Sequence, residues 1–96
     1  MLNLEGNKIS EIENLESLKS LKVLMLGNNK ITNVDYFLSH PLVLLTTLSL
    51  FKNQIEVWPV RGLLFPFLRT LLLYDNKLAT FALGGWFPSL ITLNLS

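Results

Sequence analysis

The fold of this chain is decided by a phrase that it repeats, seen most clearly in Leu24-Met25-Leu26-Gly27-Asn28-Asn29-Lys30-Ile31. Leucines stand at the first and third positions of the phrase, an asparagine at the sixth and an isoleucine at the eighth. The same spacing recurs in three further copies, one of which ends in leucine instead of isoleucine. The matching residues are Leu2, Leu4, Asn7 and Ile9; Leu48, Leu50, Asn53 and Ile55; and Leu71, Leu73, Asn76 and Leu78. A fifth copy begins at Leu93 and Leu95, so the phrase accounts for the chain from one end to the other.

The copies follow one another at a nearly constant distance. The second leucine of the phrase stands at positions 4, 26, 50, 73 and 95, so the steps are 22, 24, 23 and 22 residues. An apolar residue also precedes the first leucine by three positions in each later copy, at Leu21, Leu45, Leu68 and Leu90. A period of roughly 20–29 residues is the signature of a solenoid built from stacked repeats.

The phrase and its period resemble the leucine-rich repeat family over essentially the whole chain. Residues 9–21, which link the first two copies, are most similar to the 22-residue class of that family. This class is typified by regulatory subunits of protein phosphatase 1 and also occurs in axonemal dynein light chains and bacterial internalins. The third and fourth copies depart from the class by one or two extra residues and by Pro41, Pro59 and Pro66. The resemblance implies an α/β solenoid that binds protein partners and does not catalyse a reaction.

Each phrase is predicted to form a short strand followed by a turn. Because alternate side chains of a strand face opposite sides, the two leucines point inward and the residue between them points outward. Stacked copies then form a parallel β-sheet on the concave face, with one continuous core behind it. We expect a single leucine-rich repeat domain over residues 1–96, with about four repeats and the start of a fifth.

The return segments on the convex face are predicted to be 3₁₀ or irregular turns, or short helices. Residues 12–21 carry an apolar residue at every third position, which suits 3₁₀ or irregular turns at least as well as an α-helix. The later return segments contain prolines, which favour extended or irregular backbone.

The asparagine of the phrase is predicted to have a structural role. Where the chain turns inward after each strand, backbone groups lose their partners in the sheet, and a buried amide side chain offers donors and an acceptor to replace them. We therefore expect a ladder of buried asparagines bonded to their own and neighbouring repeats, formed by Asn7, Asn29, Asn53 and Asn76.

The concave face is the first candidate for a functional surface, because its outward positions form columns across the repeats. The columns are Met1, Val23, Thr47, Thr70 and Thr92; Asn3, Met25, Ser49, Leu72 and Asn94; and Glu5, Gly27, Phe51, Tyr74 and Ser96. An apolar and partly aromatic patch would be formed by Val23, Met25, Phe51, Leu72 and Tyr74, flanked by Glu5, Lys52 and Asp75. Such patches are typical of protein-binding surfaces. The alternative is that these side chains only cover one another and the sheet.

The convex side is a second candidate, because aromatic residues gather on the return segments. They are Trp58, Phe65, Phe67, Trp86 and Phe87. The structural interpretation is favoured here, since such residues commonly fill the outer half of a core. Pro59, Pro66 and Pro88 are interpreted as rigid turns, because they show no P-x-x-P spacing.

Composition argues against several other functions. A formal net charge of +1 without a basic stripe makes nucleic acid a poor partner. The one histidine, His40, has no hydroxyl and carboxylate arranged with it, and the carboxylates show no metal-ligand spacing, so we expect no enzyme, metal site or cofactor. The uncharged stretches 36–51 and 78–96 are interrupted by proline or glycine and fit the repeat, so no membrane span is expected. The absence of cysteine and of a signal peptide favours an intracellular location.

Two functions remain open on these grounds. The first is a protein-binding module whose concave patch holds a partner, which the 22-residue resemblance would make a phosphatase or a cytoskeletal protein. The second is a structural spacer or cap within a larger repeat protein. Neither end of the sequence carries a polar capping element, so we expect a fragment of a longer array, or self-association through the uncapped ends.

Overall fold

The computed structural model describes residues 1–57 and 65–78, together with the backbone of residues 92–94. Predictions made for Trp58, Trp86, Phe87 and Ser96 lie outside these residues, as do those for Pro59 and Pro88.

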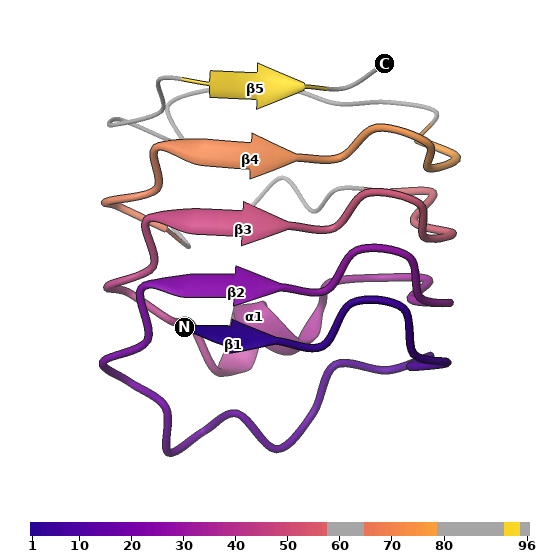
Figure 1. Ribbon diagram of the computed structural model, residues 1–96. Coiled ribbons are helices and arrows are strands. Elements are labelled where there is room, and N and C mark those ends of the chain that lie inside the picture. The colour runs from indigo at the N-terminus through magenta and orange to yellow at the C-terminus, as the bar shows by residue number, and fades with distance from the viewer. Residues whose placement is uncertain (58–64, 79–91, 95–96) are drawn as a thin grey trace.

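The described residues form one sheet of five parallel strands that follow one another in sequence order (Figure 1). The strands are β1 (Leu2–Asn3), β2 (Val23–Met25), β3 (Thr47–Ser49), β4 (Thr70–Leu72) and β5 (Thr92–Asn94). Equivalent positions of the phrase stand opposite one another, as Leu24 and Leu48 do in β2 and β3. This register confirms the predicted solenoid with a parallel sheet along one face.

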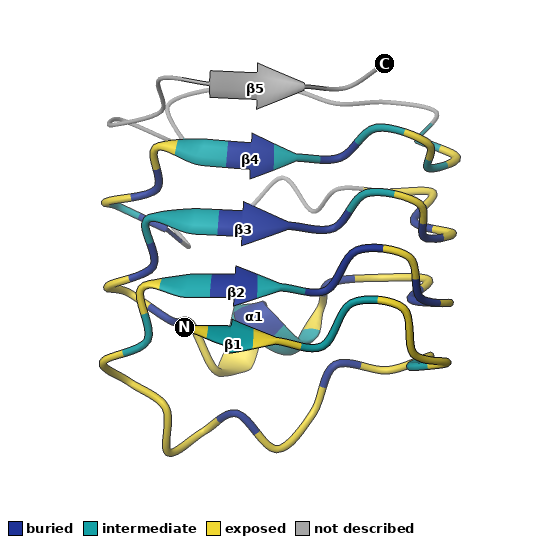
Figure 2. Cartoon of the chain, viewed as in Figure 1, coloured by how far each residue is buried: buried dark blue, intermediate teal, exposed yellow. Residues whose placement is uncertain are grey.

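The leucines of the phrase form the core behind the sheet. Leu24, Leu48 and Leu71 are fully buried, as are the isoleucines that end the second and third phrases (Figure 2). In the first repeat, by contrast, Leu2, Leu4 and Ile9 are only partly buried against the core. At these positions of the phrase, burial is therefore complete only where a repeat lies on both sides.

Tight turns shape the return segments at matching places. Leu21 N–H donates to the carbonyl of Leu18 at 3.1 Å, and Leu45 N–H donates to the carbonyl of Leu42 at the same distance. Leu68 N–H makes the corresponding bond to Phe65 at 3.2 Å. Bonds between residues three apart are the 3₁₀ pattern, which the three-residue period of residues 12–21 suits at least as well as an α-helix; the later return segments, expected to be extended or irregular, contain the same turn.

The return segment of the second repeat is partly helical, which the expected fold class allows, although its proline favours extended or irregular backbone. It contains one helical turn, α1 (Tyr36–Ser39), which lies behind the sheet (Figure 1). Phe37 on this turn is fully buried, and its ring meets that of Phe65 edge-on, with centroids 5.2 Å apart. Pro41 does not prevent the turn, because it follows the helix and only disfavours helical backbone at the preceding residue, His40.

The turn after each strand contains a residue in the left-handed backbone region. The fifth position of the phrase has a positive φ in four repeats, at Gly6, Asn28, Lys52 and Asp75. Glycine, asparagine and aspartate adopt this conformation readily, whereas a lysine does so at a cost of about 1–2 kcal/mol. The turn is therefore imposed on Lys52 by the repeat and is not a preference of that residue.

Candidate functional site

Three asparagines of the phrase lie between repeats and bond to both. Asn53 is 6 % exposed, and its Nδ2 donates to the carbonyls of Leu50 and Phe51 in its own repeat and of Leu26 in the preceding one, at 3.0–3.1 Å. Its Oδ1 accepts the N–H of Ile31 at 3.0 Å. The same four kinds of bond are made by Asn29 and Asn76.

Asn7 differs from the buried ladder residue that its position in the phrase predicts. It is exposed, and its Nδ2 donates to Leu4 and Glu5 of its own repeat at 2.9 and 3.4 Å. Asn29 and Asn53 are buried as predicted, whereas Asn76 is only half-buried, and each makes half of its bonds to the preceding repeat. No repeat precedes β1 in the sheet, where it is the edge strand. Position in the array, which the phrase does not encode, decides the difference.

The residues of the concave patch share one face of the sheet. Val23 stands opposite Thr47, and Met25 and Leu72 stand on either side of Ser49 in the strand register. Phe51 and Tyr74 follow in the third column, where Lys52 N–H donates to the Tyr74 carbonyl at 2.9 Å. All five patch residues are half-buried, so each presents only part of its side chain to solvent.

An aromatic pair forms the end of the patch nearest the turns. The rings of Phe51 and Tyr74 are stacked, with centroids 4.9 Å apart and planes only 7° from parallel. The Phe51 ring also lies over Gly27, where a Cβ atom would overlap its edge. Gly27 therefore leaves room for the Phe51 ring in the position where it stacks on Tyr74.

Ser49 lies in the middle of the same face, and its side chain is completely buried. Its position predicts an outward side chain, but the larger residues of the neighbouring columns and strands leave it no access to solvent. Its Oγ is the one buried side-chain polar atom without a hydrogen-bond partner among the described residues. The side chains around Ser49 thus cover its hydroxyl and separate it from solvent.

The most exposed large apolar side chains of residues 1–57 and 65–78 lie outside the concave patch. Apart from Met1, they belong to return segments and turns and include Val57, Phe67 and Val43, which are 60 %, 54 % and 44 % exposed. Of the aromatic residues considered for the convex side, Phe65 is fully buried in the core, whereas Phe67 is exposed. Phe65 therefore packs in the core, as the structural interpretation of these aromatic residues predicts, whereas Phe67 does not.

A small polar cluster joins the return segments of the first two repeats. The Tyr36 hydroxyl accepts the N–H of Leu15 at 2.9 Å, and the His40 ring lies against the Tyr36 ring with centroids 4.9 Å apart. Desolvation raises the pKa of Tyr36 above its ordinary value, and hydrogen bonding to the Glu16 carboxylate acts in the same direction. The pKa of Glu16 is lowered, mainly by a hydrogen bond from its own backbone and further by Tyr36 and His40.

An open pocket of about 400 Å³ lies beside this cluster and has Glu16, Lys19, His40 and Leu42 in its lining. The cluster combines the Tyr36 hydroxyl, the Glu16 carboxylate and the His40 imidazole. The hydroxyl oxygen accepts the backbone N–H of Leu15, which fixes Tyr36 to the return segment of the first repeat. The arrangement therefore links two return segments.

In the described parts of the chain, no three histidine or carboxylate side chains come together as a metal site would require. No helix within the same residues is long and apolar enough to cross a bilayer. Of the hydroxyls near His40 in sequence, that of Thr46 donates to the carbonyl of Lys22 at 3.0 Å and so has a structural partner.

Comparison with known proteins agrees with this architecture. Residues 1–42 match the family model for leucine-rich repeats in two copies. Neither the curated proteins nor the solved structures provide a match. The match and the parallel sheet together show the fold to be a leucine-rich repeat solenoid. Domains of this family generally mediate protein–protein interactions and are typically not enzymes.

Proposed function

We propose that this leucine-rich repeat chain is a non-catalytic module that binds a protein partner through its concave face. The binding surface would be the patch of Val23, Met25, Phe51, Leu72 and Tyr74. The alternative function is a structural spacer or cap in a larger repeat protein, with no partner of its own.

The observation that carries this proposal is the stacking of Tyr74 on Phe51, whose ring lies against Gly27. Two aromatic rings that are already stacked on each other lose little further conformational freedom when a partner covers them. Aromatic anchors of this kind contribute a large share of the energy in many protein interfaces.

Charged side chains beside the aromatic pair would give the binding surface a polar rim around an apolar centre. Lys52 and Asp75 are both exposed and follow Phe51 and Tyr74 directly in the sequence. Interfaces commonly have this arrangement, in which the centre is desolvated and the rim stays wet. A partner with an apolar segment between an acidic and a basic side chain would suit both features.

We further propose that residues 1–42 belong to the 22-residue class that includes regulatory subunits of protein phosphatase 1. The supporting observations are the 22-residue step from β1 to β2 and the return segment of tight turns without a helix. The class would make a phosphatase or a cytoskeletal protein the first partner to examine.

The test compares three forms of the chain as bait in affinity capture with mass spectrometry. They are the wild type, the double variant Phe51→Glu with Tyr74→Glu, and a control with Val57→Glu and Phe67→Glu. The control adds the same charge at exposed apolar positions away from the patch. Circular dichroism establishes that each bait is folded.

A partner retained by the wild type and the control but lost by the patch variant would support the proposal, and its affinity would then be measured by calorimetry with the purified protein. Equal recovery on all three folded baits would contradict a concave site and favour the spacer. Loss on the control alone would move the site to the return segments.

A further inference from the structure

The tight turns that lead into β2, β3 and β4 form one flank of the solenoid. Thr46, just after the second turn, donates its N–H to the Lys22 carbonyl at 2.7 Å, and Arg69 N–H donates to the Thr46 carbonyl at 2.9 Å. Figure 1 shows the three turns one above another at the left, where the return segments lead into the strands. Equivalent residues of successive turns therefore lie side by side. The surface formed by residues 19–22, 43–46 and 66–69 is called the tight-turn flank below.

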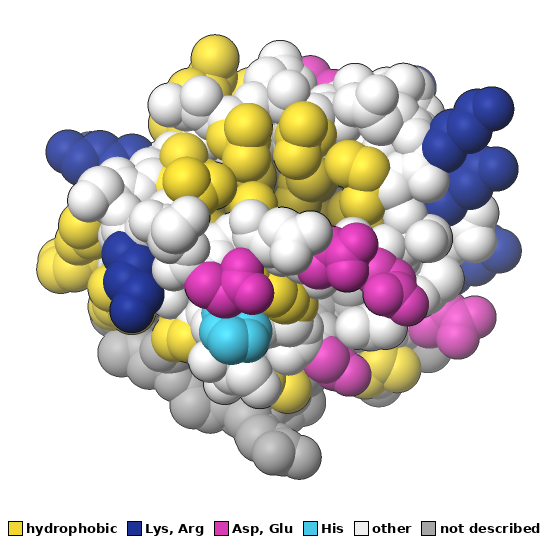
Figure 3. Space-filling model, turned by 90° about the horizontal axis from the view of Figure 1, so that it is seen from below, with side chains coloured by type: hydrophobic (Ala, Val, Ile, Leu, Met, Phe, Trp, Pro, Cys, Tyr) yellow, Lys and Arg dark blue, Asp and Glu magenta, His cyan; other side chains and the backbone are white. Residues whose placement is uncertain are grey.

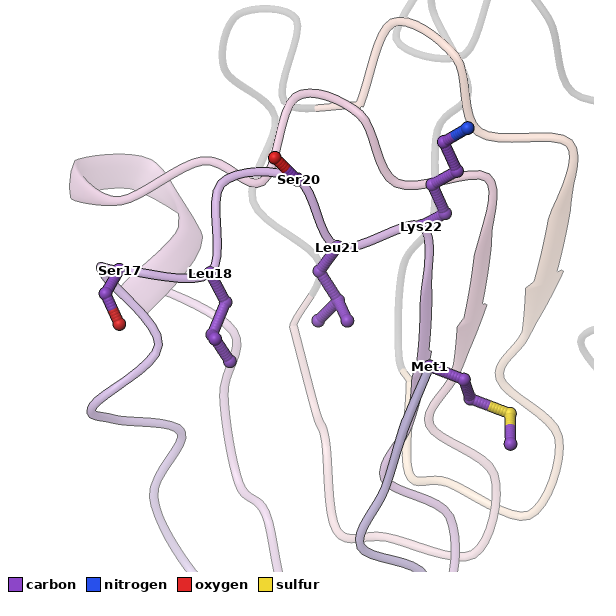
Figure 4. Close-up of a pocket in the computed structure, with 6 residues that line it drawn as sticks. All are labelled: Met1, Ser17, Leu18, Ser20, Leu21 and Lys22. Carbon is purple, nitrogen blue, oxygen red and sulfur yellow. The ribbon is translucent and has the colours of Figure 1, made fainter.

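The third residue of each tight turn points away from the core. In the first turn it is Ser20, and Figure 4 shows its side chain extending away from those of Leu18 and Leu21. The same position holds Leu44 in the second turn and Phe67 in the third, and these side chains are 39 % and 54 % exposed. The flank therefore presents apolar side chains to solvent at a position where the first turn has a hydroxyl.

The exposure of these side chains is a property of the interior of the array. Leu44 has a repeat on either side, and the residue before it, Val43, is 44 % exposed. The open pocket beside Glu16 and His40 takes in Val43 but neither Leu44 nor Phe67. Leu44 and Phe67 thus protrude from neighbouring turns and do not line that pocket.

The charged residues of the tight-turn flank are all basic. Lys19 and Lys22 lie in and after the first turn and Arg69 follows the third, and all three are exposed. The turns and the residue after each contain no aspartate or glutamate. The carboxylate nearest to the first turn in sequence, Glu16, hydrogen-bonds to Tyr36. In Figure 3, where the flank lies on the left, hydrophobic side chains stand between those of Lys and Arg.

We propose that the tight-turn flank is a contact surface for an anionic lipid bilayer. Leu44 and Phe67 enter the headgroup region, and Lys19, Lys22 and Arg69 lie against the lipid phosphates and carboxylates. This flank is a different surface from the concave patch, so the proposal does not depend on the proposed function.

The arrangement of the flank favours a bilayer over an acidic segment of another protein. Apolar side chains that protrude from turns stacked in one row can all meet a flat surface at once. Burial of such side chains at the headgroup boundary and attraction of lysine and arginine to anionic lipids are the two forces that hold proteins at a membrane surface. Each basic side chain near an anionic bilayer strengthens the association roughly fivefold.

The first test measures co-sedimentation of the whole chain with vesicles of two compositions, phosphatidylcholine alone and phosphatidylcholine with phosphatidylserine. The charge variant is Lys22→Gln with Arg69→Gln. The matched control is Lys30→Gln with Lys77→Gln, which removes the same charge from exposed residues beyond the other ends of the strands. Circular dichroism establishes that each protein is folded.

The wild type is expected to bind the vesicles that contain phosphatidylserine more tightly than those of phosphatidylcholine alone. The charge variant should bind the anionic vesicles more weakly by about tenfold or more, because two basic side chains are lost. The matched control should bind them as the wild type does.

The second test reads out which surface enters the bilayer. The chain contains no cysteine, so Phe67→Cys provides a single site for a fluorophore whose emission shifts to the blue in apolar surroundings. Val57→Cys is the matched control, because Val57 is 60 % exposed and lies outside the tight-turn flank. The emission should shift with anionic vesicles when the fluorophore is at position 67 and stay unchanged when it is at position 57.

Three results would overturn the proposal. They are equal binding, or none, to the two kinds of vesicle, an equal loss of binding in the charge variant and its control, and equal emission shifts at positions 67 and 57. The first of these would leave an acidic protein segment as the chemistry that suits the flank. Since the vesicle tests use purified protein without a protein partner, their failure leaves the proposed concave site untouched.

Discussion

Asn53→Ala is the substitution that tests most directly how the repeats are held together. Asn53 is 6 % exposed and makes four hydrogen bonds, three through Nδ2 and one through Oδ1. Alanine removes all of them and leaves the N–H of Ile31, a fully buried residue, without a partner. Water cannot replace the bond unless the junction opens.

The magnitude follows from the group left unpaired. A buried donor that loses its acceptor costs about 1–3 kcal/mol in the free energy of unfolding. Three carbonyls also lose one donor each, so the expected loss for Asn53→Ala lies in the upper half of that range. For a domain of this size each kcal/mol lowers the melting temperature by about 4–8 °C. The variant should therefore melt roughly 8 °C or more below the wild type.

The assay is urea and thermal unfolding followed by circular dichroism, with Asn7→Ala as the matched control. Asn7 is exposed and bonds only within its own turn, so its removal should change stability by no more than about 0.5 kcal/mol. Exchange of the Ile31 amide should accelerate in Asn53→Ala and not in Asn7→Ala. Equal midpoints for the two variants, with Ile31 still protected, would refute the reasoning.

Three further substitutions probe the core, the patch and the link between return segments. Leu48→Ala, at a fully buried position, should cost about 2–5 kcal/mol in urea unfolding, and a smaller loss would mean that the core collapses around it. Gly27→Ala should displace the Phe51 ring from its stack on Tyr74, at a cost of about 0.5–1.5 kcal/mol in the free energy of unfolding. The near-ultraviolet circular dichroism of the aromatic residues should change as a result. An unchanged spectrum would contradict the contact between Phe51 and Gly27. Tyr36→Phe should cost about 0.5–1.5 kcal/mol, because Leu15 N–H loses its acceptor. The pKa of Tyr36 is raised from 10.0 in the folded chain, so the stability that this residue contributes is complete below pH 10.0 and is lost as pH rises through the raised value. The wild type should therefore lose more stability than Tyr36→Phe in alkaline titration. Parallel losses in the two proteins would contradict this.

The repeat period determined the architecture without any knowledge of the tertiary structure. Leucines that alternate along a strand and recur every 22–24 residues have only one way to share a core, which is to stack in parallel. The columns of the concave face followed from the same rule, and the observed register pairs Met25 with Ser49 and Ser49 with Leu72 as the columns predict. These features depend only on backbone geometry, which every repeat shares.

The tertiary structure alone decided what depends on neighbours in space. Asn7 and Asn53 occupy the same position of the phrase, yet one is exposed and the other buried, because only one has a repeat on both sides. The stack of Phe51 on Tyr74 and the burial of Ser49 depend in the same way on side chains more than twenty residues away. A repeated phrase specifies the scaffold through local periodicity, whereas exposure and side-chain contacts depend on which residues the stacking brings together.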